Sequence, residues 1–411
     1  MDGFTCAERE LPLEQATQRI EAEWQRLGLC AQSQQWGQRV VAIHVRASDH
    51  EGRIIARGSG KGYPPCAHVG ALYETLEHHL SDHVSPDDIC WVTSCYFANS
   101  RLFIDDSVLS PLIEQPHALT ACRTYTDYLN HTTFHYPVAL CSPHYSLAPL
   151  KQDTTDYNVL KRYASNSGTA IGATYHEAVL HAVNECIERD AVALFLLDHF
   201  YYRTPSTLRR VARPTADDAL GRLWRDAEVE IGADIVVIDI SNEFLPHTFL
   251  ACSTQAGSQP RVFGSGCSLS ARHGAWRAVT ELVQLHHGLT QPEQQYHLSN
   301  AKKHLSPFPR LLRCLQFDVH VLLARCEQLT VELPDEGPTR PLADQIDRLA
   351  ADLHRHGRTL GITRLHETPL GTTLVNVVIP GLERFFVVSS GNVVVPQARG
   401  RRLRVSQGVP A

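Results

Sequence analysis

The sequence lacks the signals of several large protein classes. No C-x-x-C pair occurs among its twelve cysteines, which removes the usual pattern of structural zinc sites and dithiol redox centres. The longest apolar run, Ala191–Leu197, is far too short to span a bilayer. The polar, acidic start has no basic or apolar signal-peptide region, so we expect a cytoplasmic protein with mostly reduced cysteines.

Positive charge is also scarce. The formal net charge is −6, and the basic cluster Arg399–Arg404 lies near the C-terminus. Because binding to a phosphate backbone needs a basic surface, we expect no nucleic-acid partner. The short apolar runs likewise lead us to expect no membrane partner. A solvated tail is the simpler interpretation of the basic cluster, and a binding patch is the alternative.

The order of helical and β-branched segments predicts an α/β (mixed α+β) fold with a substantial sheet. Three times a helix-like stretch is followed by a strand-like run, a turn and a second strand-like run. These units comprise Leu13–Leu27, Val40–Val45 and Ile54–Arg57; Leu220–Glu230, Ile235–Ile240 and Thr248–Cys252; and Leu342–His356, Ile362–Leu365 and Thr373–Ile379. Structural repetition and chance similarity both remain open. The polar stretch Gln291–Pro309 predicts a loop.

Three glycine-bearing segments each precede a predicted helix with charged residues on one face. They are Gly58–Gly62, Ser165–Gly168 and Gly264–Gly266. Glycine allows positive φ and a close approach of backbones, and helix N-termini offer free N–H groups to anions. None of the segments has the spacing of a Walker A loop. The pattern predicts glycine-rich turns that lead into the helices of a binding site.

Paired glutamates are the strongest chemical signal in the chain. Glu185 and Glu188 are three residues apart, so they share one face of a helix whose other residues are largely apolar. Glu74 and Glu77 repeat this spacing on a second helix. For a single pair, an ordinary surface with Arg or Lys partners is the alternative, because an isolated buried charge is costly.

Counted together, the pairs point to a metal site. Four glutamates from two helices cannot face each other without cations, and oxygen-rich sites with magnesium and substrate phosphates are the natural solution. Arg277 and Glu281, four residues apart on a third helix, would add a phosphate clamp and one more carboxylate. Arg189 would supply a further positive charge.

Four segments resemble, in order, the signature elements of the YcaO family and together cover roughly residues 40–385. Ser165–Ala191 resembles the Ser-Asn-Gly turn and Glu-x-x-Glu-Arg-Asp helix. Arg57–His79 resembles the Gly-Lys-Gly segment with the first Glu-x-x-Glu helix. Gly264–Gln284 and Asn376–Glu383 are similar to the third helix and to the late Pro-Gly-Leu-Glu turn. The resemblance implies an N-terminal helical lead-in over 1–39, a catalytic domain over 40–390 and a tail over 391–411.

The resemblance also implies a Walker-free nucleotide site for ATP and Mg²⁺. The residues with an implied catalytic role are Glu185, Glu188 and Arg277. The implied magnesium ligands are Glu74, Glu77, Glu185, Glu188 and Glu281. The implied contacts with ATP and its phosphates come from Lys61, Glu74, Glu77, Ser165, Asn166, Glu177, Glu185, Glu188, Arg189, Arg277 and Glu281.

The implied reaction is ATP-dependent activation of backbone amides in a ribosomally synthesised precursor peptide. The leading expectation is cyclodehydration of Cys, Ser or Thr to azolines in natural-product biosynthesis. The alternatives are thioamide formation with a TfuA-type partner, or a non-catalytic accessory role. The expected partners are the precursor peptide and a separate leader-binding E1-like (ocin-ThiF) or TfuA-type protein, with a homodimer as the expected oligomeric state.

The sequence departs from the family pattern at four places. His78 stands where arginine is usual, Gly70 where serine is common, and Ala173 where some members have asparagine. The chain ends in RVSQGVPA rather than in the proline-rich tail that the resemblance links to azoline formation. This last difference bears on the product and not on the use of ATP.

Overall fold

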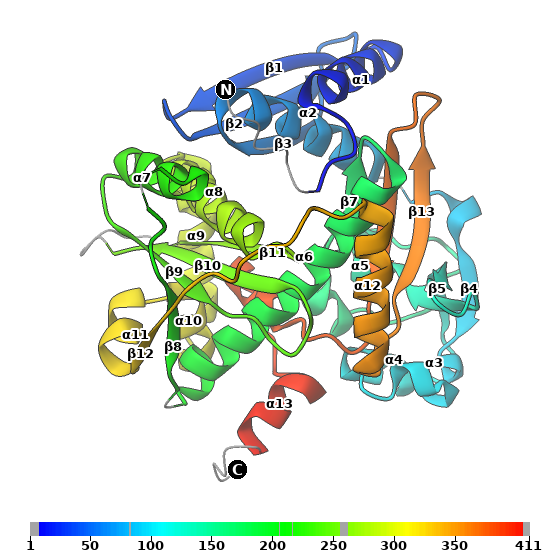
Figure 1. The fold of residues 1–411 in the computed structure, drawn as a ribbon. Coiled ribbons are helices and arrows are strands. Elements are labelled where there is room, and N and C mark those ends of the chain that lie inside the picture. Colours follow the sequence, from blue (N-terminus) through cyan, green and yellow to red (C-terminus); the bar gives the residue numbers. More distant parts are fainter. Residues whose placement is uncertain (1–7, 82–83, 205, 216, 255–261, 406–411) are drawn as a thin grey trace.

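The computed structural model describes residues 8–81, 84–204, 206–215, 217–254 and 262–405. Its strands form three sheets, with helices packed on and between them (Figure 1). The first sheet has the order β1-β2-β3, formed by Cys30–Trp36, Val41–Ser48 and Ile54–Gly62. All its pairs are antiparallel, and the helices α1 (Leu13–Arg26) and α2 (Pro64–Ser81) accompany it.

The second sheet has five strands in the order β11-β10-β9-β8-β12. They are Phe263–Ser268, His247–Ser253, Ile235–Asp239, Leu208–Val211 and Gln328–Val331. Apart from the parallel pair β8–β12, the neighbouring strands are antiparallel. The helices α7 (Ala219–Ile231) and α8 (Ala271–Leu289) share a hydrophobic core with this sheet.

The third sheet has six strands, with the order β4-β5-β13-β14-β7 and β6 paired to β5. They are Cys90–Thr93, Leu119–Asp127, Gly361–Glu367, Thr373–Val378, Thr169–Gly172 and Thr133–Pro137. Every residue of β14 is buried, as expected for a strand covered on both faces. The helices α6 (Tyr175–Leu196) and α12 (Leu342–Arg355) share an apolar core with β14.

The remaining helices are mostly short and lie around these layers. They are α3 (Cys95–Asn99), α4 (Ser110–Ile113), α5 (Val138–Cys141), α9 (Pro292–Leu305), α10 (Pro309–Gln316), α11 (Val319–Arg325) and α13 (Ala398–Val405). The helix α6 continues into a π-helical segment over Leu197–Tyr202. Of the helices that the structure describes, none combines the length and apolar character that crossing a bilayer requires.

Three helices lie at the junctions between the three sheets. The helix α2 contacts β2 and β3 of the first sheet and β7 of the third. The helix α6 contacts β7 and β14 of the third sheet and β10 and β11 of the second, and α8 contacts β9–β11 of the second sheet and β2 and β3 of the first. Each of the three helices therefore bridges a different pair of sheets, and together they surround one central region (Figure 1).

The mixed α/β fold class and all three predicted helix–strand–strand units are confirmed. In each unit the two predicted strands are antiparallel neighbours: β2 with β3, β9 with β10, and β13 with β14. The structure adds the polar strand β1, which the sequence did not indicate because its side chains are mostly exposed. The predicted loop over Gln291–Pro309 is wrong, since Pro292–Leu305 forms α9, a helix with a single buried residue.

The prediction of three glycine-rich turns is wrong for two of the segments. Gly58–Gly62 lies within β3, and Gly264–Gly266 lies within β11. Their glycines permit close packing of a helix on the strand: a Cβ on Gly60 would overlap the carbonyl oxygen of Ala67 in α2. Ser165–Gly168 is a true turn, where Gly168 has a φ of 82°, a conformation that favours glycine.

The two domain boundaries remain predictions, although both cross continuous structure. The boundary at residues 39 and 40 falls between β1 and β2, and every residue of β1 pairs with β2. The boundary at residues 390 and 391 precedes a segment in which Val394, Gln397 and Gly400 are buried. The last six residues of the chain, with the sequence SQGVPA, lie outside the described residues.

The close packing of α2 on β3 predicts a large effect of a single methyl group. We expect Gly60→Ala to lower the free energy of unfolding by about 1–3 kcal/mol, because the strand and the helix must move apart. Gly288→Ala is the control, since a Cβ there meets no atom within 4 Å and alanine favours the helix by up to about 1 kcal/mol. Urea unfolding measures both, and equal stabilities of the two variants would contradict the close packing.

Candidate active site

The three junction helices bring the predicted carboxylates together. The helix α2 carries Glu74 and Glu77, and both side chains are half-buried. On α6, the side chains of Glu185 and Glu188 are 17% and 4% exposed. On α8, Glu281 is 20% exposed. Each residue lies in the body of its helix rather than at its N-terminus, so carboxylates and not backbone N–H groups form the site.

The titration behaviour of the carboxylates indicates that they face one shared space. Burial raises the pKa of Glu77 well above its usual value, and the negative charges of Glu74 and Glu185 raise it further. Burial also raises the pKa of Glu185 to about 7, with Arg189 opposing this shift and Glu188 adding to it. Each of these pKa values is raised by a carboxylate on another helix, since Glu185 acts on Glu77 and Glu281 acts on Glu185. The negative charge of the site therefore exceeds what its cations balance.

Three cationic side chains partly compensate this negative charge. The Lys61 ammonium on β3 donates to Glu281 Oε2 at 2.5 Å. Although burial alone would raise the pKa of Glu281, Lys61 and Arg189 together hold it below its usual value. Arg277 on α8 places its NH2 group 3.8 Å from Glu188 Oε2. Arg189 Nε lies 3.7 Å from Glu185 Oε1.

Two polar atoms of the site have unused hydrogen-bonding capacity. Glu188 Oε1 accepts a hydrogen bond of 2.6 Å from the Ser265 hydroxyl, which stands between the two glycines of β11. Glu188 Oε2 is buried without a hydrogen-bond partner, and so is Arg189 Nε. A carboxylate oxygen without a partner can bind a cation, and a guanidinium N–H without a partner can bind an anionic oxygen. The two atoms together therefore fit a ligand that brings both cations and anionic oxygens.

The structure adds Glu8 to the site, a residue that the sequence did not indicate. Its carboxylate is 4% exposed and accepts hydrogen bonds from Ser268 at 2.6 Å and Asn184 at 2.9 Å. His273 and Arg277 lie 3.5 and 3.6 Å from its second oxygen. Burial would raise the pKa of Glu8, but His273, Arg277 and Ser268 lower it to about 2. Nothing in the local sequence marks Glu8, because all its partners lie elsewhere in the chain.

A second addition, His181, did have a sequence signal. It lies four residues before Glu185 on α6, on the same helix face. Its Nδ1 is 3.2 Å from Arg277 NH1, and burial together with the charge of Arg277 lowers its pKa well below the usual value. The imidazole is therefore neutral and accepts a hydrogen bond from the guanidinium.

Three predicted nucleotide contacts have hydrogen-bond partners outside this cluster, and their role remains a prediction. Glu177 is in the first turn of α6, and its carboxylate accepts hydrogen bonds from the backbone N–H groups of Glu10, Leu11 and Ala173. The Ser165 hydroxyl accepts from the N–H of Ser167 within the turn before β7, and the Asn166 carbonyl accepts from Thr169. These contacts stabilise the turn before β7 and join the first turn of α6 to the segment before α1.

Comparison with protein families identifies the same part of the chain. A model described as YcaO cyclodehydratase, ATP- and Mg²⁺-binding, matches residues 59–383. A relative from Rhizobium leguminosarum bv. trifolii, named "uncharacterized protein in tfuA 3′ region", is 27% identical over 242 residues. That match covers 53% of this chain and 52% of the relative, so the chain spans about half the length of this curated relative.

Solved structures share the fold at low sequence identity. YcaO from Methanopyrus kandleri, bound with AMPPCP and Mg²⁺, superposes with a TM-score of 0.64 at 16% identity, covering 96% of this chain and 98% of that chain. A heterocyclase in complex with substrate and cofactor gives 0.64 at 18% identity, covering 91% and 52% of the two chains. The Escherichia coli microcin synthetase McbBCD complex gives 0.58 at 13% identity, covering 87% and 88%.

The donor set of the site fits the two groups that the family description names. Within the described ranges, no group of three or more His, Cys, Asp or Glu side chains converges closely enough to hold a metal. Magnesium is commonly bound by one or two carboxylates together with substrate phosphates and water. The paired glutamates would supply the carboxylates, and Lys61, Arg189 and Arg277 would neutralise the phosphates.

The raised pKa of Glu185 predicts a stability that falls with pH. Because the folded-state pKa of about 7 lies above the unfolded value, the contribution of this group is fully present below the unfolded pKa and is lost as pH rises through 7. Between about pH 6 and pH 8 we expect a loss of about 1 kcal/mol. Thermal unfolding across this range measures it. Glu185→Gln should weaken the pH dependence of stability, and bound Mg·ADP should weaken it in the wild type. An unchanged pH dependence in Glu185→Gln would contradict the raised pKa of Glu185.

Proposed function

Because the chain belongs to the YcaO family of ATP- and Mg²⁺-binding cyclodehydratases, we propose that it activates a backbone amide of a ribosomally made precursor peptide. In the leading form of the proposal, a Cys, Ser or Thr side chain of that peptide closes onto the preceding carbonyl to give an azoline. ATP and Mg²⁺ are the cofactors. The cluster of five glutamates with Lys61, Arg189 and Arg277 is the observation that supports this function most directly.

The chemistry explains why the reaction needs ATP. Addition of the side-chain sulfur or oxygen to the amide carbonyl leaves an oxygen that departs poorly as hydroxide. Transfer of the γ-phosphoryl group to this oxygen forms a new O–P bond, with ADP as the leaving group. The C–O bond then breaks, phosphate departs, and loss of the N–H proton completes the C=N bond. The peptide has lost the elements of water, and the nucleotide has become ADP and phosphate.

The residues of the site match the needs of this transfer. Phosphoryl transfer depends mainly on positioning and on charge neutralisation rather than on covalent catalysis by the protein. Arg277, supported by the neutral His181 and by Glu188, would hold the transferred phosphoryl group. Glu185 and Glu188 would hold magnesium from α6, with Glu74 and Glu77 opposite them on α2 and Glu281 on α8. Lys61 would approach the phosphates from β3.

Thioamide formation is the second candidate, and one observation favours it. The Rhizobium relative is named for its position beside tfuA, which suggests a TfuA-type partner for this chain as well. In that reaction an external sulfide adds to the activated amide and phosphate departs. The result is exchange of oxygen for sulfur. Both candidates share the same ATP step, so they differ in the nucleophile and in the partner protein.

The proposal includes a separate partner that delivers the peptide, either an E1-like leader-binding protein or a TfuA-type subunit. The McbBCD relative is itself a complex, which supports a multi-protein arrangement. A homodimer is part of the same proposal. An accessory role without turnover is disfavoured, because this chain retains all the paired glutamates and Arg277.

Glu188→Gln tests the ATP step. Glutamine still accepts the Ser265 hydrogen bond but removes one negative charge from the magnesium site, so we expect peptide-dependent phosphate release to fall by about 100-fold or more. Phosphate release is measured with the precursor peptide and the partner protein present. Glu14→Gln is the matched control, because Glu14 is exposed on α1, and it should retain full activity. Normal turnover in Glu188→Gln would refute the proposed site.

The mass of the modified peptide distinguishes the two candidate functions. Cyclodehydration removes about 18 Da per site, whereas exchange of oxygen for sulfur adds about 16 Da, as the elemental balance of an activated amide requires. The precursor peptide is incubated with ATP, Mg²⁺ and the chain, with an E1-like or a TfuA-type partner, with and without sulfide. We expect the loss of mass with the E1-like partner. A gain of mass that depends on sulfide and the TfuA-type partner would replace azoline formation by thioamidation.

A further inference from the structure

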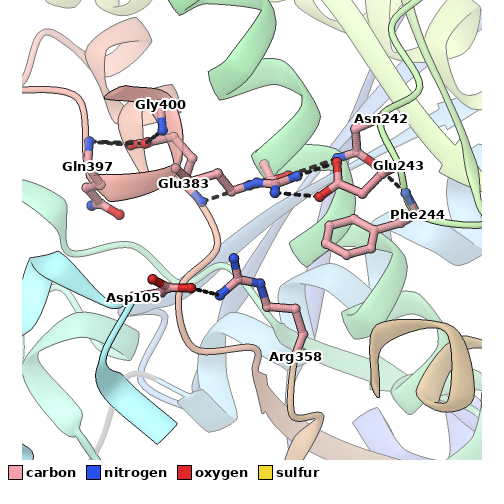
Figure 2. Close-up of polar contacts among 10 residues, drawn as sticks. Asp105, Asn242, Glu243, Phe244, Arg358, Glu383, Gln397 and Gly400 are labelled. Atoms are coloured by element: carbon pink, nitrogen blue, oxygen red, sulfur yellow. Dashed lines mark hydrogen bonds and ion pairs between the residues drawn. The ribbon is translucent and has the colours of Figure 1, made fainter. Parts of the chain in front are cut away.

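The chain returns near its C-terminus to pack beside α6, the helix that carries Glu185 and Glu188. Figure 2 shows this contact region, with Glu383, Gln397 and Gly400 on one side and Glu243 and Phe244 on the other. The segment before α13, which includes the buried residues Val394 and Gln397, leads into this helix at Ala398. The link between this segment and α6 is the side chain of Arg399.

Arg399 is held by two carboxylates at once. Its Nε and NH2 groups donate to Asp190 Oδ1 at 2.7 Å and Oδ2 at 2.9 Å. Its Nη1 and Nη2 atoms also donate to the two oxygens of Glu243 at 2.5 and 2.8 Å. The guanidinium lies 5.1 Å from the ring centroid of Phe244, and the side chain is 12% exposed. The solvated-tail interpretation of the basic cluster is therefore wrong for Arg399, whereas Arg401 and Arg402 are exposed.

The partner of Arg399 on α6 is fully buried. Asp190 follows Arg189 directly and lies two residues after Glu188, and its side chain has no exposed surface. Besides Arg399, it accepts hydrogen bonds of 2.8 Å from Asn242 Nδ2 and from the backbone N–H of Glu383. Arg399 is the cation within hydrogen-bonding distance that balances this charge, and its planar fork matches a carboxylate in a way that a lysine cannot.

Glu383 fixes the same segment a second time. Its carboxylate accepts hydrogen bonds from the backbone N–H groups of Gln397 and Gly400 at the start of α13. Gly400 also packs closely on Leu197, the first residue of the π-helical segment that continues α6, so that a Cβ on Gly400 would overlap the Leu197 side chain. The segment is thus anchored by contacts other than the Arg399 side chain, and that side chain joins Asp190 on α6 to Glu243 and Phe244.

We propose that Arg399 is a positioning residue for the active site. Through Asp190 it fixes the rotation of α6 about its axis and therefore the placement of Glu185, Glu188 and Arg189 around Mg·ATP. It also neutralises the buried charge of Asp190, which lies two residues after Glu188 on the same helix. This inference rests on the use of ATP by the chain and is independent of the peptide product.

Four variants test this role without peptide or partner. Arg399→Ala removes the hydrogen bonds to Asp190 and Glu243. Arg399→Lys keeps the positive charge but cannot form paired hydrogen bonds with both carboxylates. The double variant Arg399→Ala/Asp190→Asn removes both the link and the unbalanced charge. Arg402→Ala is the matched control, because Arg402 lies on the same helix, is 62% exposed and pairs with Asp105 instead. Titration calorimetry measures the Kd of Mg·ADP, and thermal unfolding measures the Tm of each variant.

We expect Arg399→Ala to lower the Tm and to weaken Mg·ADP binding by about tenfold. Arg399→Lys and the double variant should recover most of the Tm but not the affinity, whereas Arg402→Ala should match the wild type in both. Recovery of affinity together with Tm in the double variant would show a merely structural role and overturn the proposal. Wild-type affinity in Arg399→Ala would also overturn it. If the wild type itself fails to bind Mg·ADP, the assignment of the ATP site fails first, so the two failures are distinguishable.

Discussion

Five carboxylates from three helices share one space, and the repulsion between them constrains the rest of the structure. Burial and mutual charge raise the pKa of Glu74, Glu77 and Glu185, so the protein by itself does not fully balance this region. Lys61, Arg189 and Arg277 supply part of the missing positive charge. The remaining deficit suits a site that binds Mg²⁺ and nucleotide phosphates together, because the metal supplies positive charge to the carboxylates and the phosphates pair with the guanidinium groups.

The glycines of β3 and β11 make this arrangement sterically possible. A side chain at Gly60, Gly264 or Gly266 would overlap the backbone of the helix that packs on it. The strands therefore allow α2 and α8 to lie unusually close to their sheets, with their acidic faces turned toward α6. Ser265, between two such glycines, then reaches Glu188. The glycines act here through helix–strand distance and not through an anion-binding loop.

Both ends of the described chain are connected to α6. Near the start, Glu8 bonds to Asn184 on α6 and lies beside Arg277. Near the end, Arg399 bonds to Asp190 on the same helix. These contacts join residues separated by 176 and 209 positions in the sequence. The helix with the central glutamates is thus held by parts of the chain that carry none of the family's signature residues.

The sequence by itself determined the elements with strong periodicity and indicated the residues that we propose for the site. The three helix–strand–strand units follow from apolar patterns, and Glu74, Glu77, Glu185, Glu188, Arg277 and Glu281 follow from spacing within single helices. Local spacing is visible in a sequence because neighbouring turns of one helix fix it. It does not reveal that Gly58–Gly62 is strand, that the polar segment Pro292–Leu305 is helix, or that Glu8 and Arg399 approach α6. Those features depend on packing between distant segments, and only the tertiary structure decided them.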